Sequence, residues 1–168
     1  IESLILSSTL SSASLWAKEQ HRWIRYLSLE DQEAIQQAEK EKNFSSIAYQ
    51  EANDHFMKWH CGDFSNDRWA CLQREKKIGK ESYLVAWGPN EYCPMGTLST
   101  FEVSDELKMI SCPTLIISGT EDLCSPVVAK TMFDRIPCAK WELVSDARHM
   151  VFVDQFERYQ SIMKDWLG

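Results

Sequence analysis

The feature that most limits the fold of this chain is a short apolar run that begins after Pro113. The run reads Thr114-Leu115-Ile116-Ile117-Ser118 and is rich in β-branched residues. A strand with one buried face alternates apolar and polar residues, whereas a continuous apolar run of this length is typical of a parallel strand covered on both faces. The run therefore predicts a parallel sheet with helices packed on both sides.

The segments on either side of this run support the same architecture. Leu4-Ile5-Leu6 is another short apolar run, and the residues from Ala139 to Val144 form a further strand pattern. Pro126 suits the first turn of a helix that runs to about Arg135, and apolar residues from Phe152 to Trp166 indicate a closing helix. The order of strand, long helical stretch, strand, helix, strand and helix predicts an α/β fold.

The long helical stretch lies between the first two predicted strands. Apolar residues recur at helical spacing from Ala13 to Leu27, and Ser28-x-x-Asp31 resembles a capping box for a helix that reaches Lys42. Ser45 or Ser46 is placed to cap a third helix, and shorter helical patterns cover residues 67–77 and 80–87. The third helix is predicted to present one shared face made of Ile47, Ala48, Ala52, His55, Phe56 and Trp59.

A helical block of this length inside a parallel α/β pattern is best explained as an inserted lid. We therefore predict three segments along the chain. Residues 1–11 supply a core strand, residues 12–101 form a helical cap, and residues 102–168 form the rest of the core.

Composition excludes several functions. The chain has 168 residues with 18 Lys and Arg against 25 Asp and Glu, a formal charge of −7, which argues against sequence-independent binding to nucleic acid. No apolar run approaches the roughly 20 residues that span a bilayer, so we expect no membrane insertion. Six cysteines are scattered without a Cys-x-x-Cys pair. This scatter predicts no metal site and reduced thiols, which favours the cytoplasm.

Two titratable residues follow the predicted core strands. Asp122 comes after the strand that ends at Ser118, and His149 comes after the next strand. Because parallel strands joined by one crossover helix end at the same edge of a sheet, these side chains are expected to lie close together. A carboxylate that accepts a hydrogen bond from a histidine leaves the other ring nitrogen free as a general base toward Ser or Cys. The plainer alternative is a turn aspartate and an unrelated loop histidine.

Several motifs in the second half of the chain resemble one family. They are Trp87-Gly88-Pro89-Asn90-Glu91-Tyr92, Pro113-Thr114-Leu115, Gly119-x-x-Asp122 and the loop that carries His149. Together they resemble the C-terminal part of the proline iminopeptidases, which are α/β-hydrolase aminopeptidases. The opening residues 4–8 and 12–16 are also similar to this family, and the resemblance is weakest over residues 29–78. It implies the C-terminal part of an α/β-hydrolase sheet with an inserted helical cap.

The resemblance also implies roles for individual residues. Asp122 is the expected triad acid and His149 the general base, whereas Glu91 is expected to bind the free α-amino group of the substrate. Asp63 is a candidate for a second such carboxylate. Trp87, Tyr92 and Phe64 are candidates for the wall of a prolyl pocket, with simple core packing as the alternative.

The chain departs from the family in one respect. It contains no Gly-x-Ser-x-Gly, because no two of its six glycines are four residues apart, and it has no His-Gly-Gly loop. The nucleophile and the oxyanion hole are therefore expected upstream of Ile1, in a longer protein, and the segment alone is expected to be inactive. Ser125 is not a substitute because it lacks the strained elbow that exposes a nucleophilic serine.

The function predicted from these features is a serine aminopeptidase that releases N-terminal proline, or a similar residue, through an acyl-enzyme. Its expected substrates are small peptides with a free N-terminus, and no metal or organic cofactor is implied. Two alternatives stay open: another α/β-hydrolase such as an amidase, esterase or epoxide hydrolase, and a non-catalytic binding module if Ile1 is the true start. The sequence does not predict the oligomeric state.

Overall fold

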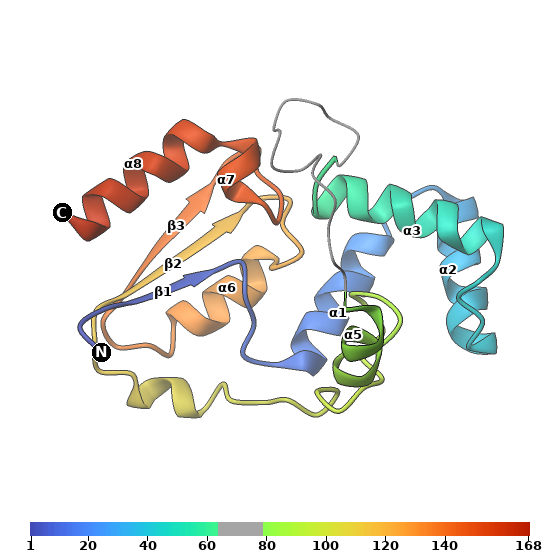
Figure 1. The fold of residues 1–168 in the computed structure, drawn as a ribbon, viewed down its shortest axis with the longest axis horizontal. Helices are drawn as coiled ribbons and strands as arrows, with labels where there is room; N and C mark the ends of the chain where they lie inside the picture. Colours follow the sequence, from blue (N-terminus) through green and yellow to red (C-terminus); the bar gives the residue numbers. More distant parts are fainter. Residues whose placement is uncertain (64–78) are drawn as a thin grey trace.

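A computed structural model describes residues 1–63 and 79–168 as a parallel sheet at one end and a group of helices at the other (Figure 1). The strands are β1 (Leu4–Ser7), β2 (Thr114–Gly119) and β3 (Ala139–Val144), and their order in the sheet is β1-β2-β3. Both pairings are parallel. The predicted parallel sheet is therefore confirmed, with β2 at its centre.

The central strand explains the apolar run in the sequence. All six residues of β2 are buried. Leu115 and Ile117 pack against Ile162 in one apolar cluster, whereas Ile116 packs with Val128 in a second cluster on the other face. Each side chain of this kind contributes about 2 kcal/mol when it is fully buried. Because both faces of the strand are covered, a polar side chain without a partner would be costly here, and the hydroxyls of Thr114 and Ser118 each have a hydrogen-bond partner.

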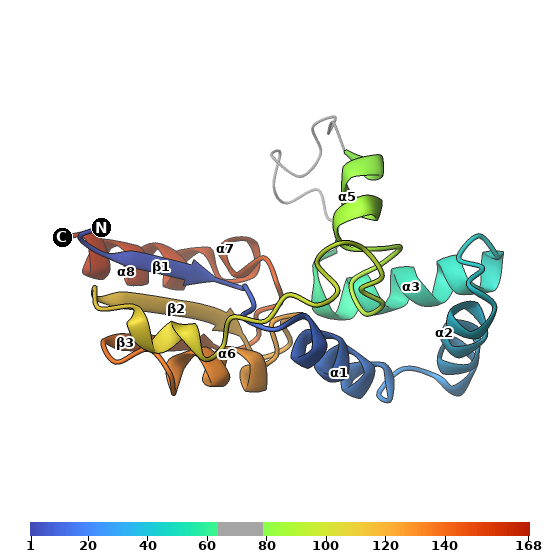
Figure 2. The ribbon, with the colours of Figure 1, turned by 90° about the horizontal axis from the view of Figure 1, so that it is seen from below.

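Helices cover the two faces of the sheet as predicted. Helix α6 (Pro126–Phe133) lies on one face, and α7 (Val151–Asp154) and α8 (Phe156–Leu167) lie on the other (Figure 2). Pro126 occupies the first turn of α6, and the Ser125 hydroxyl caps this helix by accepting from the Val128 N–H. The predicted single closing helix is divided at Gln155, whose extended φ of −131° separates α7 from α8.

Within the described residues, the helical block contains α1 (Ala13–Ile24), α2 (Leu29–Glu41), α3 (Ile47–His60) and α5 (Lys80–Ala86). Ser12, Ser28 and Ser46 each cap the helix that follows by accepting a backbone N–H. The predicted helix over residues 67–77 lies outside the described residues. A short 3₁₀ helix, η1 (Glu106–Met109), follows the block. No helix within the described ranges is long and apolar enough to cross a membrane.

The face predicted for α3 is only partly buried: Ala52 and Phe56 are buried, whereas the other four residues are exposed. Ile47 is 74% exposed and Trp59 is 65% exposed. His55 is exposed as well. Polar aromatic residues are buried in their place because each finds a hydrogen-bond partner: the Tyr49 hydroxyl accepts from Asn90, and the His60 ring bonds to a backbone carbonyl. The residues of α3 that are buried are Tyr49, Ala52, Phe56 and His60.

The chain enters and leaves the helical block at neighbouring points. The Ala13 N–H donates to the Phe101 carbonyl over 2.9 Å, and the Val103 N–H donates to the Ser11 carbonyl over 2.8 Å. The hydroxyls of Ser11 and Ser104 lie 2.9 Å apart. Adjacent entry and exit points allow the block to be inserted between β1 and β2 without disturbing the pairing of these strands.

Candidate active site

Asp122 lies just beyond the carboxyl end of β2 and is completely buried. Its Oδ1 atom accepts a hydrogen bond from the Cys124 N–H over 2.8 Å. Its Oδ2 atom accepts from the Gly119 N–H over 3.1 Å and from the Ser8 hydroxyl over 2.6 Å. A buried carboxylate with this many donors is compensated for the water it has lost.

His149 lies beyond the carboxyl end of β3 and meets Asp122. Its Nδ1 atom is 2.9 Å from Asp122 Oδ1, and its side chain is 31% exposed. The ring also contacts the Trp16 ring edge-to-face, with centroids 6.2 Å apart. The structure therefore brings these two predicted site residues together in the geometry that fixes the Nδ1–H tautomer and leaves Nε2 free.

The environment of His149 changes its proton affinity. Burial lowers the pKa of His149, but the hydrogen bond and the charge of Asp122, with a further contribution from Glu91, outweigh burial and raise the pKa above its ordinary value. Beside Asp122, His149 therefore holds its imidazolium proton more tightly than an isolated histidine in water does. Such stabilisation of the imidazolium is what a general base needs after it has accepted a proton.

A glycine at the end of β2 allows the histidine loop to come this close. A Cβ atom on Gly119 would clash with the carbonyl group of Ala147 and would lie 2.9 Å from the Arg148 carbonyl oxygen. The backbone that leads to His149 therefore packs directly on the end of β2. Asp146, with a φ of 54°, turns the chain into this loop in the left-handed conformation that aspartate tolerates.

Hydrogen bonds connect the helical block to the loops that carry Asp122 and His149. The carbonyl of His60, at the end of α3, accepts from the His149 N–H over 3.0 Å and from the Leu123 N–H over 3.3 Å. The Trp23 indole N–H donates to the Asp122 carbonyl over 3.2 Å, and the Gln20 amide donates to the Leu123 carbonyl. The block therefore helps to position the acid and the histidine in addition to covering them.

Glu91 is held near this pair by two hydrogen bonds. The Tyr83 hydroxyl donates to Glu91 Oε1 over 2.7 Å, and the Trp16 indole N–H donates to the Glu91 main-chain carbonyl over 3.0 Å. Burial and then the charge of Glu91 raise the pKa of Tyr83 above its ordinary value, so this hydroxyl keeps its proton and acts as a donor. Because the ring of Trp16 also contacts His149, one buried side chain links Glu91 to the histidine.

Asp63 is placed differently. Its carboxylate is 28% exposed and lies 3.5 Å from the Lys58 ammonium group. Its charge also contributes to the raised pKa of Arg148. A role for Asp63 in binding a substrate amine stays a prediction.

The aromatic candidates for a pocket wall separate into two groups. Tyr92 is completely buried, and its hydroxyl donates to Asn53 over 3.1 Å, so it packs in the core of the helical block. Trp87 contacts Trp16 edge-to-face at 6.5 Å and is therefore one aromatic neighbour away from His149. Phe64 lies outside the described residues.

None of the described hydroxyl or thiol groups is hydrogen-bonded to the free nitrogen of His149. Burial, followed by the charges of Glu91 and Asp122, raises the pKa of Cys61 to about 12, so this thiol stays protonated. Ser125 is completely buried, and its hydroxyl donates to Glu19 over 2.7 Å. The described residues thus contain a hydrogen-bonded carboxylate and imidazole, with no hydroxyl or thiol among them bonded to the second ring nitrogen.

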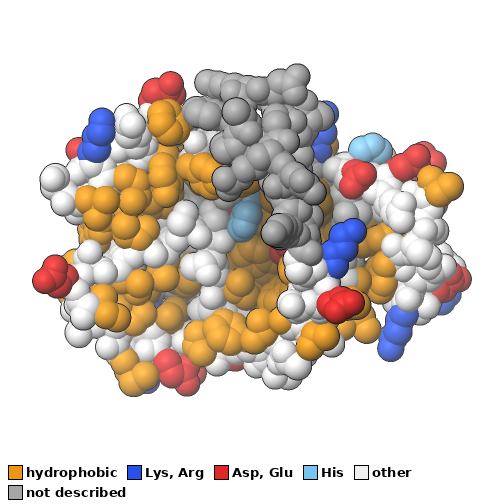
Figure 3. Space-filling view, in the orientation of Figure 1, with side chains coloured by type: hydrophobic (Ala, Val, Ile, Leu, Met, Phe, Trp, Pro, Cys, Tyr) orange, Lys and Arg blue, Asp and Glu red, His pale blue; other side chains and the backbone are white. Residues whose placement is uncertain are grey.

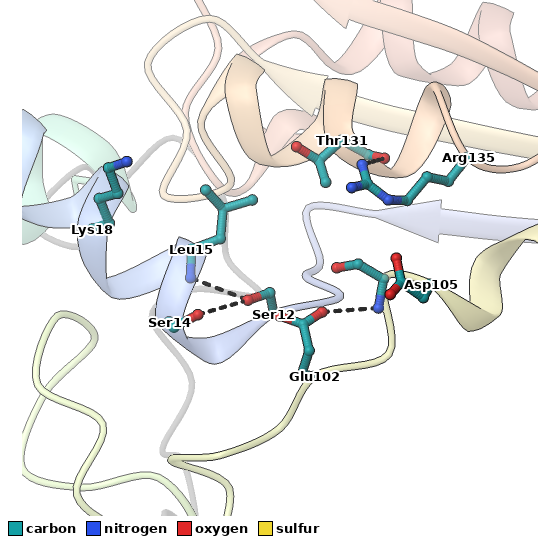
Figure 4. Close-up of a pocket in the computed structure, with 9 residues that line it drawn as sticks. Ser12, Ser14, Leu15, Lys18, Glu102, Asp105, Thr131 and Arg135 are labelled. Atoms are coloured by element: carbon teal, nitrogen blue, oxygen red, sulfur yellow. Dashed lines mark hydrogen bonds between the residues drawn. The ribbon is translucent and has the colours of Figure 1, made fainter.

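One face of the molecule is hollowed. Figure 3 shows hydrophobic side chains gathered around a hollow near the middle of one face, with a histidine on its wall. A separate cavity of about 670 Å³ lies between the start of α1, α6 and the segment that leaves the helical block (Figure 4). It is lined by Ser12, Ser14, Leu15, Lys18, Glu102, Ser104, Asp105, Thr131 and Arg135. Neither Asp122 nor His149 lines this cavity, so it is distinct from the acid–histidine pair.

Known proteins share this sequence and this fold. The chain is 51% identical over 167 residues to the proline iminopeptidase of Lactobacillus helveticus, and 51% identical over 169 residues to that of Clostridioides difficile. The chain is a relative of the proline iminopeptidases. It spans 57% of the length of the L. helveticus protein, although 99% of the chain is matched. No protein-family model matches the chain.

Solved structures of other proteins superpose on this fold. VinJ superposes with a TM-score of 0.87 at 25% identity, and the proline iminopeptidase of Mycobacterium smegmatis superposes with a TM-score of 0.84 at 22% identity. The matches cover 99% and 98% of this chain and 57% and 56% of those proteins. The chain therefore has the fold of the C-terminal part of an α/β-hydrolase, and the superpositions cover nearly all of it.

Sequence reasoning missed four residues that shape the site. Trp16 and Tyr83 hold Glu91, and the carbonyl of His60 joins the two loops. Ser8 binds the carboxylate of Asp122. Tyr83 is only eight positions from Glu91, but the partners of the other three are far away along the chain, so no local pattern marks those three. The sequence feature that comes closest to indicating a role for Ser8 is its position at the carboxyl end of a predicted core strand.

Proposed function

We propose that this chain is the acid–base and cap portion of a proline iminopeptidase-like serine aminopeptidase. The observation that carries the proposal is the pair formed by buried Asp122 and His149 Nδ1 at 2.9 Å, beyond the ends of two neighbouring parallel strands. The sequence identity to proline iminopeptidases supports the choice of substrate. The nucleophilic serine and the oxyanion hole belong to a portion of the enzyme outside this chain.

The proposed mechanism assigns one task to each residue. His149 Nε2 accepts the proton of the serine hydroxyl as this oxygen attacks the carbonyl carbon of the N-terminal residue. Asp122 holds the ring and stabilises the imidazolium. His149 then gives its proton to the departing amine of the shortened peptide. In the second half of the reaction it accepts a proton from the water that releases the acyl group.

The proposed role of Glu91 is recognition of the substrate. An aminopeptidase must distinguish a protonated chain terminus from an internal amide, and a carboxylate does so by a charge-assisted hydrogen bond. Glu91 is held near His149 by the contacts of Trp16 and Tyr83, which supports this role. We propose Asp63 as a second carboxylate of this site. The substrates are then small peptides that carry a free N-terminus.

Two further parts of the proposal concern the whole chain. We propose residues 12–101 as the cap, inserted into a core formed by residues 1–11 and 102–168, and the adjacent entry and exit points near Ser12 support these limits. We also propose the cytoplasm as the compartment. The five cysteines in the described ranges are free, as in a chain that folds under reducing conditions.

Tests of turnover use what we call the completed enzyme. In it, this chain replaces the matched part of the L. helveticus proline iminopeptidase, whose remaining N-terminal portion is kept. We expect Glu91→Gln in the completed enzyme to lower kcat/KM for proline p-nitroanilide about thirtyfold, the effect of losing one charge-assisted hydrogen bond. Hydrolysis of p-nitrophenyl acetate, which has no amine, is expected to stay unchanged.

The matched control is Glu81→Gln, which makes the same change at an exposed position of α5. This variant is expected to keep both activities. Unchanged turnover of proline p-nitroanilide by Glu91→Gln would contradict the proposed amine recognition. An esterase, amidase or epoxide hydrolase that makes no use of a free amine would give that result.

A further inference from the structure

Ser8, which follows β1 directly, has an unusual backbone conformation. Its φ is 46°, in the left-handed region that residues other than glycine, asparagine and aspartate adopt uncommonly. Its N–H donates to the Ile117 carbonyl over 2.9 Å, so the residue is still fastened to β2. Glycine would adopt this conformation with less strain, so the serine side chain is the feature to be explained.

The hydroxyl of Ser8 reaches across the sheet edge to the acid. It donates to Asp122 Oδ2 over 2.6 Å, although the two residues are 114 positions apart. Each carboxylate oxygen of Asp122 thus receives one backbone and one side-chain hydrogen bond. The Cys124 N–H and His149 bond to Oδ1, and the Gly119 N–H and Ser8 bond to Oδ2.

The four hydrogen-bond partners of the Asp122 carboxylate differ in the part of the structure to which they connect it. Gly119 ends β2 and Cys124 lies in the loop that follows it, so both are close to Asp122 along the chain. Ser8 directly follows another strand, β1, so its bond connects the carboxylate of Asp122 to the end of that strand. We propose that Ser8 is a positioning residue for the catalytic acid, because its hydroxyl holds Oδ2 of Asp122 and thereby keeps Oδ1 directed at His149. This inference rests on the acid–base pair of the proposed function.

The bond has an electrostatic consequence as well as a geometric one. A donor on Oδ2 stabilises the carboxylate anion and takes up part of its charge. Without that donor, Asp122 attracts the imidazolium proton more strongly, and the pKa of His149 rises further. Glu91 also acts on the pKa of His149 through its charge, and the charge of Asp122 acts on the titratable groups His60, Cys61 and Cys124. Removal of the Ser8 hydroxyl changes none of these four groups.

The test uses Ser8→Gly and Ser8→Ala in the completed enzyme. Glycine removes the hydroxyl and accepts the left-handed backbone freely, whereas alanine removes the hydroxyl and keeps the Cβ atom. Both variants are expected to lower kcat for proline p-nitroanilide about tenfold with little change in KM. The acid limb of the kcat/KM profile is expected to move to higher pH, because a neutral His149 is the active form. The matched control is Ser7→Ala, an exposed serine one position earlier.

The results for the Ser8 variants either support or contradict the proposed role of this residue. A Ser8→Gly variant with the parent kcat and an unmoved acid limb would overturn the proposal, even if Ser8→Ala were inactive or unfolded. Loss of thermal stability without movement of the acid limb would also overturn it, since that is the signature of a purely structural residue. Asp122→Asn is measured in parallel. If that variant keeps full activity, the proposed function fails together with this inference, whereas if Asp122→Asn alone loses activity, the failure belongs to Ser8.

Discussion

Asp122→Asn in the completed enzyme is expected to lower kcat for proline p-nitroanilide by about four orders of magnitude, the loss expected when a triad carboxylate becomes an amide. The amide presents an N–H or a carbonyl oxygen where His149 needs an anion. The imidazole then loses its fixed tautomer, and the imidazolium that forms during attack loses its stabilising charge. KM is expected to change little, because Asp122 is completely buried behind His149 and does not reach the substrate.

The same variant makes a prediction about pH. The raised pKa of His149 places the acid limb of kcat/KM above the value of about 6.5 for an isolated histidine. Burial lowers this pKa and Asp122 raises it, so removing the carboxylate charge leaves burial dominant. The acid limb of the residual activity of Asp122→Asn is therefore expected to move to lower pH.

The matched control for this experiment is Asp165→Asn, at an exposed position of α8. It is expected to match the parent enzyme in kcat, KM and pH profile. Retention of a tenth or more of the parent kcat by folded Asp122→Asn would contradict the role of Asp122 as the triad acid.

Gly119→Ala is expected to cost about 3 kcal/mol of unfolding free energy or more, because the added methyl group meets backbone atoms that have no room to move. It would clash with the carbonyl of Ala147 and would lie 2.9 Å from the carbonyl oxygen of Arg148. Relief of this clash requires the loop to move away from β2. That movement takes His149 away from Asp122, so activity is expected to fall together with stability.

Urea unfolding followed by tryptophan fluorescence measures the first effect, and turnover of proline p-nitroanilide measures the second. The matched control is Gly79→Ala, where the nearest neighbouring atom is the Cβ of Ser82 at 3.7 Å. This control is expected to lie within about 0.5 kcal/mol of the parent protein. If Gly119→Ala unfolds at the parent urea concentration and keeps its activity, the close packing of the histidine loop on β2 is wrong.

The core of the fold could be predicted because its signals are local. The continuous apolar run from Thr114 to Ser118 predicts a strand covered on both faces. In the structure, all six residues of β2 are buried. Topology predicted that Asp122 and His149 lie close together, since parallel strands end at one edge of the sheet, and the family resemblance favoured a functional pair over an unrelated turn aspartate and loop histidine.

Other features depend on partners that are distant in the sequence. The buried face of α3 differs from the predicted one because it includes Tyr49 and His60. Their polar groups can be buried only because Asn90 and the Glu121 carbonyl provide hydrogen bonds. The role of Ser8 depends on a carboxylate 114 residues away. Hydropathy along one segment carries no information about such contacts, so the structure was needed to find them.

The central claim is that this chain supplies the acid and the base of a serine aminopeptidase whose nucleophile lies elsewhere. The most direct test measures release of p-nitroaniline from proline p-nitroanilide by three proteins: the isolated chain, the completed enzyme and the completed enzyme with His149→Ala. We predict that only the completed enzyme is active. A folded completed enzyme that releases no p-nitroaniline, or one whose activity survives His149→Ala, would contradict the claim.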